Sequence, residues 1–170
     1  MKHPSNDPAC GICKTNSGEA PIPGGIIFEN ELWLVRHLMP GRGVPGWMMV
    51  QSQRHVAGIS SFDDEEAANF GPAFRHFQKV LQEVTGALRI YAASMNESFP
   101  HFHCHLVPRY AQMPKNASGW DVFDLIRASG EGEIAVDGDE AEKLTEKYRA
   151  ALKASPPPNQ AATATDTTDQ

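Results

Sequence analysis

A chain of 170 residues is long enough to form one domain with a substantial hydrophobic core. Its hydrophobic share of 41% and charged share of 21% are typical of a globular protein. The formal net charge of -6 argues against a protein that coats nucleic acid, although a local basic patch can still hold a nucleotide.

No apolar run approaches the length of a membrane span, and residues 1–8 lack the apolar segment of a secretory signal. The three cysteines are odd in number, and two of them form a CxxC pair, which does not resemble a disulfide framework. We therefore expect no membrane partner and a reducing, cytoplasmic location.

Short apolar segments bounded by glycine, proline and polar residues predict five strands. They cover residues 25–28, 32–37, 47–50, 88–95 and 102–107. The longest helix is expected over 61–85, because a serine and four acidic residues precede an apolar stripe of helical period and Gly86 ends it. Pro72 lies inside this run, where a proline can kink or restart a helix.

Two further helices are expected over 120–128 and 139–153, and residues 154–170 have too few large apolar side chains to order. The succession of strands, helix, strands and helices predicts an α+β fold, with a five-stranded antiparallel sheet and helices on one face.

Near the middle of the chain, His101, His103 and His105 alternate with apolar residues. Seven histidines in 170 residues should produce such a triplet by chance in only about one chain in a hundred. On a strand the three imidazoles share one face, about 6.5–7 Å apart between neighbours. Phe102, Cys104 and Leu106 would then point into the core.

Three uses of this histidine row are open. A solvated row without function is disfavoured, since burying three polar rings without partners costs several kcal/mol. Imidazole is a common metal ligand, but adjacent strand histidines need a further ligand to close a tetrahedral site. Alternatively, one neutral imidazole attacks phosphorus while its neighbours hold the phosphate oxygens.

The His-apolar-His-apolar-His sequence with two following apolar residues resembles the signature of the histidine triad (HIT) superfamily of nucleotide hydrolases and transferases. Pro108-Arg109 after the triplet, Cys10-Gly11-Ile12-Cys13 before the first strand and Val44-Pro45-Gly46-Trp47 are similar to features of one branch of that family. The resemblance covers about residues 10–110 and implies a catalytic domain there. Residues 111–153 would then be a helical extension that packs on it.

The resemblance implies that His103 is the nucleophile, which attacks an α-phosphate and forms a nucleotidyl-histidine intermediate. His105 would donate hydrogen bonds to the phosphate or the leaving group, and His101 would orient the nucleophile or the phosphate. Only a neutral histidine can attack, and the three rings should titrate as a coupled set. This scheme requires no cofactor.

Other matched positions are implied as nucleotide contacts. Asn96 is placed to contact phosphate, and Ser98 to supply a hydroxyl or a backbone N–H. His37 occupies the position where the family holds the ribose with an acidic or amide side chain, which is a departure. Val35 and Met49 either wall the base pocket or are plain core residues. Trp47 stands where the family often has a histidine, and we expect it to pack.

A lone CxxC is a weak signal, because a zinc site needs four ligands. By resemblance to relatives that include the galactose-1-phosphate uridylyltransferases, His55 and His101 would complete a structural zinc site with Cys10 and Cys13. His101 would then be a ligand instead of a free catalytic group. A redox use of the pair lacks the expected strand-to-helix context.

The sequence therefore favours a nucleotide phosphohydrolase or nucleotidyl transferase acting through His103. Its substrates would be purine nucleotides or conjugates, such as nucleoside phosphoramidates or dinucleoside polyphosphates, and no nucleic-acid polymer. The alternatives are a non-catalytic nucleotide-binding regulator and a zinc-stabilised structural module. The resemblance also implies a homodimer.

Overall fold

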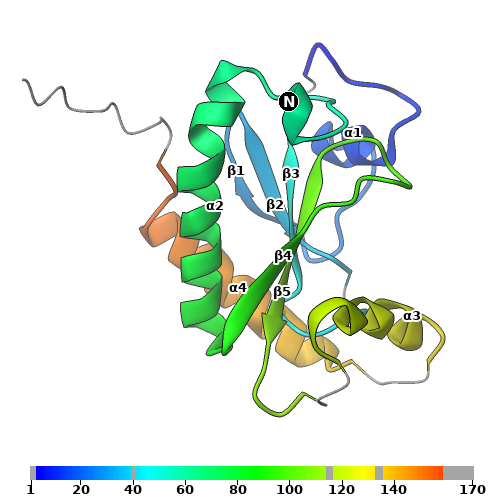
Figure 1. Ribbon diagram of the computed structural model, residues 1–170, viewed down its shortest axis with the longest axis vertical. Helices are drawn as coiled ribbons and strands as arrows, with labels where there is room; N and C mark the ends of the chain where they lie inside the picture. Colours follow the sequence, from blue (N-terminus) through cyan, green and yellow to red (C-terminus); the bar gives the residue numbers. More distant parts are fainter. Residues whose placement is uncertain (1–2, 40, 114–116, 133–135, 159–170) are drawn as a thin grey trace, which may run out of the picture.

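The computed structural model describes residues 3–39, 41–113, 117–132 and 136–158. Five strands form one sheet in the order β1-β2-β3-β5-β4, and every neighbouring pair is antiparallel (Figure 1). The strands are β1 Ile26–Glu29, β2 Trp33–His37, β3 Met48–Ser52, β4 Arg89–Ala93 and β5 His103–Arg109. The predicted α+β fold with a five-stranded antiparallel sheet is confirmed.

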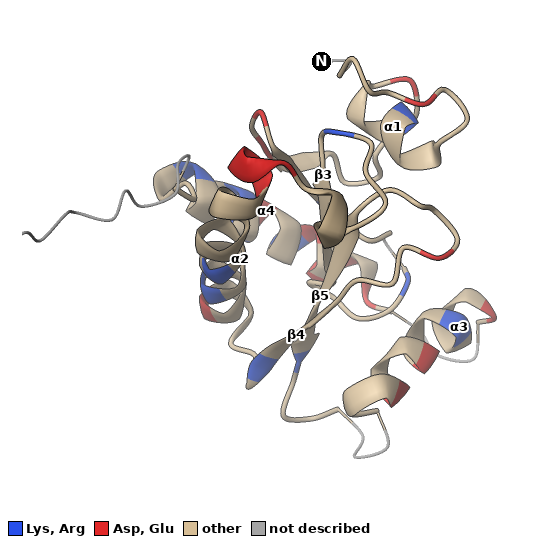
Figure 2. Cartoon of the chain, turned by 45° about the horizontal axis from the view of Figure 1, so that its top comes forward, with Lys and Arg blue, Asp and Glu red and all other residues tan. Residues whose placement is uncertain are grey.

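One face of the sheet is covered by the helices α2 Asp64–Thr85 and α4 Gly138–Ala154, whereas α1 Gly11–Asn16 and α3 Asp124–Gly130 lie on the other side (Figure 2). Alternate strand residues such as Trp33, Val50 and Leu106 point toward α2 and form the core. Residues one position away on each strand therefore face α1 and α3.

The start of α2 differs from the prediction. We expected a serine, Ser60 or Ser61, to cap the helix, but the capping residue is Asp63. The carboxylate of Asp63 accepts from the Glu66 N–H at 2.9 Å, and Glu66 accepts from the Asp63 N–H at 3.0 Å, which is a capping box. Ile59–Ser61 forms a separate 3₁₀ turn. Pro72 stands inside α2 without ending it.

Arg54 joins the end of β3 to this helix start. Its guanidinium lies 2.5 Å from the carboxylate of Glu66, whose side chain is 2% exposed, and 3.4 Å from Asp63. A nearly buried carboxylate needs such a partner, because its charge is otherwise uncompensated.

Helix α4 packs against α2 and β1. The hydroxyl of the buried Tyr148 donates to the Phe77 carbonyl at 2.9 Å, and Leu152 completes this side of the core. The chain then continues along α2, where Asn69 Nδ2 donates to the Pro158 carbonyl at 2.8 Å. Residues 155–158 of the tail predicted as disordered thus lie against α2. Residues 159–170 lie outside the described residues.

The helix expected over 120–128 is divided into a 3₁₀ turn, Gly119–Phe123, and α3. Val122 and Phe123 pack with Trp47 and Val107 in a second apolar cluster on the side of the sheet away from α2. Within the described residues, no helix is both long and apolar enough to cross a membrane.

Candidate active site and metal-ligand cluster

His103 and His105 project from β5 on the face away from α2, with ring centroids 5.5 Å apart. Both are partly exposed. His103 Nδ1 lies 2.8 Å from the His101 carbonyl, which can only accept a hydrogen bond. The ring proton of neutral His103 therefore sits on Nδ1, and the lone pair is on Nε2.

The main chain of His103 is held by residues that follow β4. Its N–H donates to Asn96 Oδ1 at 3.1 Å, and its carbonyl accepts from the Ser94 hydroxyl at 2.8 Å. Asn96 has a φ of 54°, a left-handed conformation that asparagine tolerates better than most residues. Asn96 therefore lies beside the main chain of His103, and Ser98 is exposed in the loop that follows.

His105 is contacted by an aromatic pair. The indole Nε1–H of the fully buried Trp47 donates to His105 Nδ1 at 3.0 Å. Phe123 packs edge-on against both rings, at centroid distances of 5.6 Å to Trp47 and 5.9 Å to His105. Trp47 is thus packed, as expected, but it also makes a polar contact that the sequence did not reveal.

Arg36 is a further member of this face that sequence reasoning missed. Register pairs Arg36 on β2 with Met49 on β3, and Met49 with His105 on β5, so the three side chains form one row across the sheet. The guanidinium donates to the His37 carbonyl at 3.1 Å, the Leu38 carbonyl at 2.9 Å and Gln51 Oε1 at 3.1 Å. An arginine inside an apolar strand was the available signal, since a charge there needs a reason.

The histidines on this face are held neutral. Burial lowers the pKa of His105 to about 4, with further lowering by the charges of His103 and Arg36. Burial also lowers the pKa of His103, and Arg36 adds to that effect. A neutral His103 with a free Nε2 lone pair is the form that can act as a nucleophile.

His101 lies on the same side of the sheet, toward α1, but unlike the other two histidines it is closed off from solvent. It precedes β5, and its ring turns into the interior, where it is fully buried. Its Nε2 lies 2.8 Å from the Ser52 carbonyl, and its Nδ1 lies 3.6 Å from Cys10 Sγ and 3.4 Å from Cys13 Sγ. These buried partners hold the ring in the interior beside α1.

The four residues expected to hold zinc come together. The ligand atoms of Cys10, Cys13, His55 and His101 all lie within 4.8 Å of one another, and Cys13 Sγ is 3.3 Å from His55 Nδ1. Helix α1, which the sequence did not predict, starts directly after Cys10 and places Cys13 one turn later. Among the described residues, no other group of three or more such side chains is this close.

This donor set fits a tetrahedral zinc ion. Zinc bonds of 2.3 Å to sulfur and about 2.05 Å to nitrogen at tetrahedral angles separate the two donors by about 3.6 Å. The sulfur-to-nitrogen distances of 3.3, 3.4 and 3.6 Å are close to that value. Because His101 Nε2–H donates to the Ser52 carbonyl, its Nδ1 presents a lone pair to the cluster, as a metal-binding histidine does.

Val35 and His37 lie on the opposite face of the sheet from His103 and His105. Val35 belongs to the core under α2, and His37, two residues further along the strand, points the same way. His37 is 1% exposed, and neither ring nitrogen has a hydrogen-bond partner within the described residues. The expected contacts of these two residues with a nucleotide on the histidine face are therefore not supported, because strand alternation turns both toward the helices.

His37 instead lines a cavity of about 210 Å³ between the sheet and α4. Burial, together with the neighbouring charge of Arg36, lowers its pKa to about 4. The cavity is also lined by Gly24, Gly138, Ala141, Glu142, Thr145 and Glu146.

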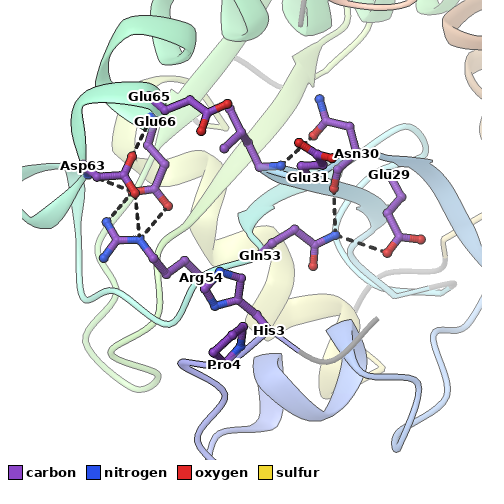
Figure 3. A pocket seen from close by; sticks show the side chains of 11 residues that line it. His3, Pro4, Glu29, Asn30, Glu31, Gln53, Arg54, Asp63, Glu65 and Glu66 are labelled. Carbon is purple, nitrogen blue, oxygen red and sulfur yellow. Dashed lines mark hydrogen bonds and ion pairs between the residues drawn. The ribbon is translucent and has the colours of Figure 1, made fainter.

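A larger cavity of about 650 Å³ lies beside the start of α2 and contains none of the predicted site residues (Figure 3). Its polar groups bond to one another. Arg54 pairs with Glu66, and Gln53 Nε2 donates to Glu29 Oε1 and to the Asn30 carbonyl, both at 3.2 Å. These contacts fix the helix start and the end of β3.

No family model matches the chain. A Bacillus subtilis protein named protein hit is 23% identical over 108 residues, which are 61% of this chain and 72% of that protein.

Solved structures resemble the fold over much of the chain. A Hit-like protein from Bartonella henselae, described as involved in cell-cycle regulation, has a TM-score of 0.63 and 19% identity, over 86% of this chain and 98% of that one. A zinc-bound histidine triad family protein from Mycobacterium smegmatis has a TM-score of 0.62 and 21% identity, over 86% and 94% of the two chains. A HIT family hydrolase from Clostridium thermocellum has a TM-score of 0.52 and 19% identity, over 64% and 97%.

The resemblance noted in the sequence is thus confirmed for the fold, and the motif occupies the fifth strand of the sheet and the residues just before it. The chain has the fold of the histidine triad family, and its sequence from His101 to Val107 resembles that family's signature.

Proposed function

We propose that this protein is a nucleotide phosphohydrolase or nucleotidyl transferase in which His103 attacks the α-phosphate of a purine nucleotide conjugate. The observation that carries the proposal is the hydrogen bond of 2.8 Å from His103 Nδ1 to the His101 carbonyl. It leaves Nε2 unprotonated on a partly exposed ring, as a nucleophile requires. One of the similar structures is that of a HIT family hydrolase, which agrees with this chemistry.

In the first step, the Nε2 lone pair forms a bond to phosphorus and the bond from phosphorus to the leaving group breaks. Water then attacks the nucleotidyl-histidine, and His103 recovers its electron pair. The charge of Arg36 and the side chains of His105 and Asn96 would attract and orient the phosphate. Ser98 and Met49 remain proposed contacts, whereas Val35 and His37 have no part in this scheme.

We also propose that Cys10, Cys13, His55 and His101 hold a structural zinc ion, which would tie α1 to the ends of β3 and β5. Zinc needs deprotonated thiols, and burial beside Cys10 raises the pKa of Cys13 to about 11, so the ion would supply the charge that favours the thiolate. His101 then acts through its carbonyl, as a positioning residue for His103. No catalytic cofactor is part of this scheme.

Residues 10–110 would form the catalytic domain, with 111–153 packed on it. We further propose a cytoplasmic homodimer. The reduced thiols that zinc requires support the location, and sedimentation analysis tests the dimer.

The proposal predicts that His103→Ala lowers turnover of nucleoside phosphoramidates and dinucleoside polyphosphates by about 1,000-fold or more, as loss of a nucleophile does elsewhere. Acid-quenched wild-type protein should carry one nucleotidyl group on His103, detectable by peptide mass spectrometry. The matched control is His76→Ala, which removes a histidine on α2, on the opposite side of the sheet from His103. This variant should keep full turnover. Unchanged hydrolysis in folded His103→Ala protein would reject the role of His103.

A further inference from the structure

The indole of Trp47 can only donate a hydrogen bond to His105. An indole nitrogen carries a proton and accepts no hydrogen bond, so in the 3.0 Å contact His105 Nδ1 must be the acceptor. The single ring proton of neutral His105 is therefore on Nε2. Protonating Nδ1 as well would set two N–H groups against each other, which opposes formation of the imidazolium.

The surroundings of His105 favour the same neutral state. Among the described residues, the charged or titratable groups that face it are His103 on its own strand and Arg36 across β3, and both lower its pKa. The other neighbours are uncharged: Trp47, Met49, Ala93 and Phe123.

Resting on the proposed function, we infer that Trp47 is a positioning residue that fixes His105 as a neutral Nε2–H donor, and that the site consequently prefers substrates whose leaving group is a phosphate. A neutral imidazole can stabilise a departing oxygen by a hydrogen bond. It cannot readily give up its last proton, because an imidazolate would remain.

The two substrate classes make different demands on His105. When His103 attacks a phosphoanhydride, the P–N bond to Nε2 forms, the P–O bond breaks, and the leaving phosphate keeps the electron pair. His105 retains its proton throughout. Water later adds to phosphorus, the P–N bond to His103 breaks, and the proton of the water passes to solvent. A phosphoramidate amine leaves poorly as an anion and needs a proton from an acid, which a neutral His105 supplies badly.

The test compares wild type, Trp47→Phe and a packing control. Phenylalanine keeps a ring in the buried cluster but removes the N–H. Val122→Ala loosens the same cluster, in which Val122 is fully buried, without touching the hydrogen bond. Thermal unfolding of all three proteins establishes which variants are folded at the assay temperature.

The first measurement is independent of activity. Nitrogen-15 NMR of labelled histidine should show His105 as the Nε2–H tautomer, and neutral at pH 7, in wild type and in Val122→Ala. In Trp47→Phe the pKa of His105 should rise. An Nδ1–H tautomer or a protonated ring in wild type at pH 7 would overturn the inference.

The second measurement is the ratio of kcat/KM for diadenosine tetraphosphate to that for adenosine 5′-phosphoramidate. We expect the ratio to exceed one in wild type and Val122→Ala, and to fall by about two- to tenfold in Trp47→Phe, the effect of one lost hydrogen bond. An unchanged ratio in folded Trp47→Phe overturns the leaving-group preference. If folded wild type turns over neither substrate, the proposed function fails together with that preference, and the NMR tautomer still decides the role of Trp47.

Discussion

Removing the proposed zinc ion should destabilise this protein by an amount set by the ratio of free zinc to its dissociation constant. The cluster ties three distant parts of the chain, at Cys10 and Cys13, at His55 and at His101, so the unfolded chain cannot bind the ion in the same way. At free zinc about 1,000 times the dissociation constant, binding to the native state alone adds about 4 kcal/mol to the free energy of unfolding. In a chain of this size each 1 kcal/mol moves Tm by about 2–4 °C, so a chelator should lower Tm by about 8–16 °C.

The assay is differential scanning calorimetry of protein purified with zinc, with and without a strong chelator, alongside metal analysis. Cys13→Ala should contain no zinc and should show the same low Tm in both buffers. Cys104→Ala is the matched control, because it also removes a buried thiol, but one in the core under α2. Its Tm should still fall on chelation. Wild-type protein with much less than one zinc per chain and a Tm unaffected by chelator would refute the reasoning.

Two further predictions concern His37 and Arg54, which lie outside the proposed active site. His37 has its pKa lowered to about 4, so below its unfolded pKa of about 6.5 the unfolded chain binds more protons than the native state. Stability is then full above about pH 6.5 and should decrease by about 2 kcal/mol from this residue between pH 6.5 and 5. His37→Leu should flatten that part of the urea-unfolding pH profile, and an unchanged slope would contradict the assignment. Arg54→Ala should lower the free energy of unfolding by about 2 kcal/mol, less than the 3–5 kcal/mol of a fully buried pair because Arg54 is 28% exposed. Arg75→Ala, an exposed arginine on α2, should change it little, and equal effects of the two substitutions would show that the Arg54–Glu66 pair does not matter.

The sheet and its main helix were predictable because their signals are local. Alternation along β5 correctly assigned Phe102, Cys104 and Leu106 to the core, and the 3.6-residue stripe located α2. The exact start of α2 was missed, because Asp63 competes with two upstream serines and its contacts with Glu66 and Arg54 decide the outcome.

Residue pattern alone predicted the site only where one strand carries it, whereas the set Cys10, Cys13, His55 and His101 followed from the family resemblance. His103 and His105 followed from the pattern, but the direction of the His101 ring depends on two cysteines about 90 positions earlier in the sequence. Arg36 and Trp47 reach the histidine face through strand register and ring orientation, which no short window of sequence contains. His37 lies on the same face of the sheet as Trp33, because residues four positions apart on one strand share a face. This part of the site could have been predicted from the sequence.

The double anchorage of His101 has a consequence for how such a site can diversify. Its ring is pinned in the interior by the Ser52 carbonyl and the thiols, while its own carbonyl aims His103. The direction of the His103 ring is thus set by the rigid interior. Among the exposed residues 97–100, the Phe99 carbonyl also accepts from the His101 N–H at 2.7 Å, a main-chain contact that does not depend on the identity of the side chain. Substitutions of the side chains in that surface segment can therefore admit new molecules while His103 Nε2 keeps its direction.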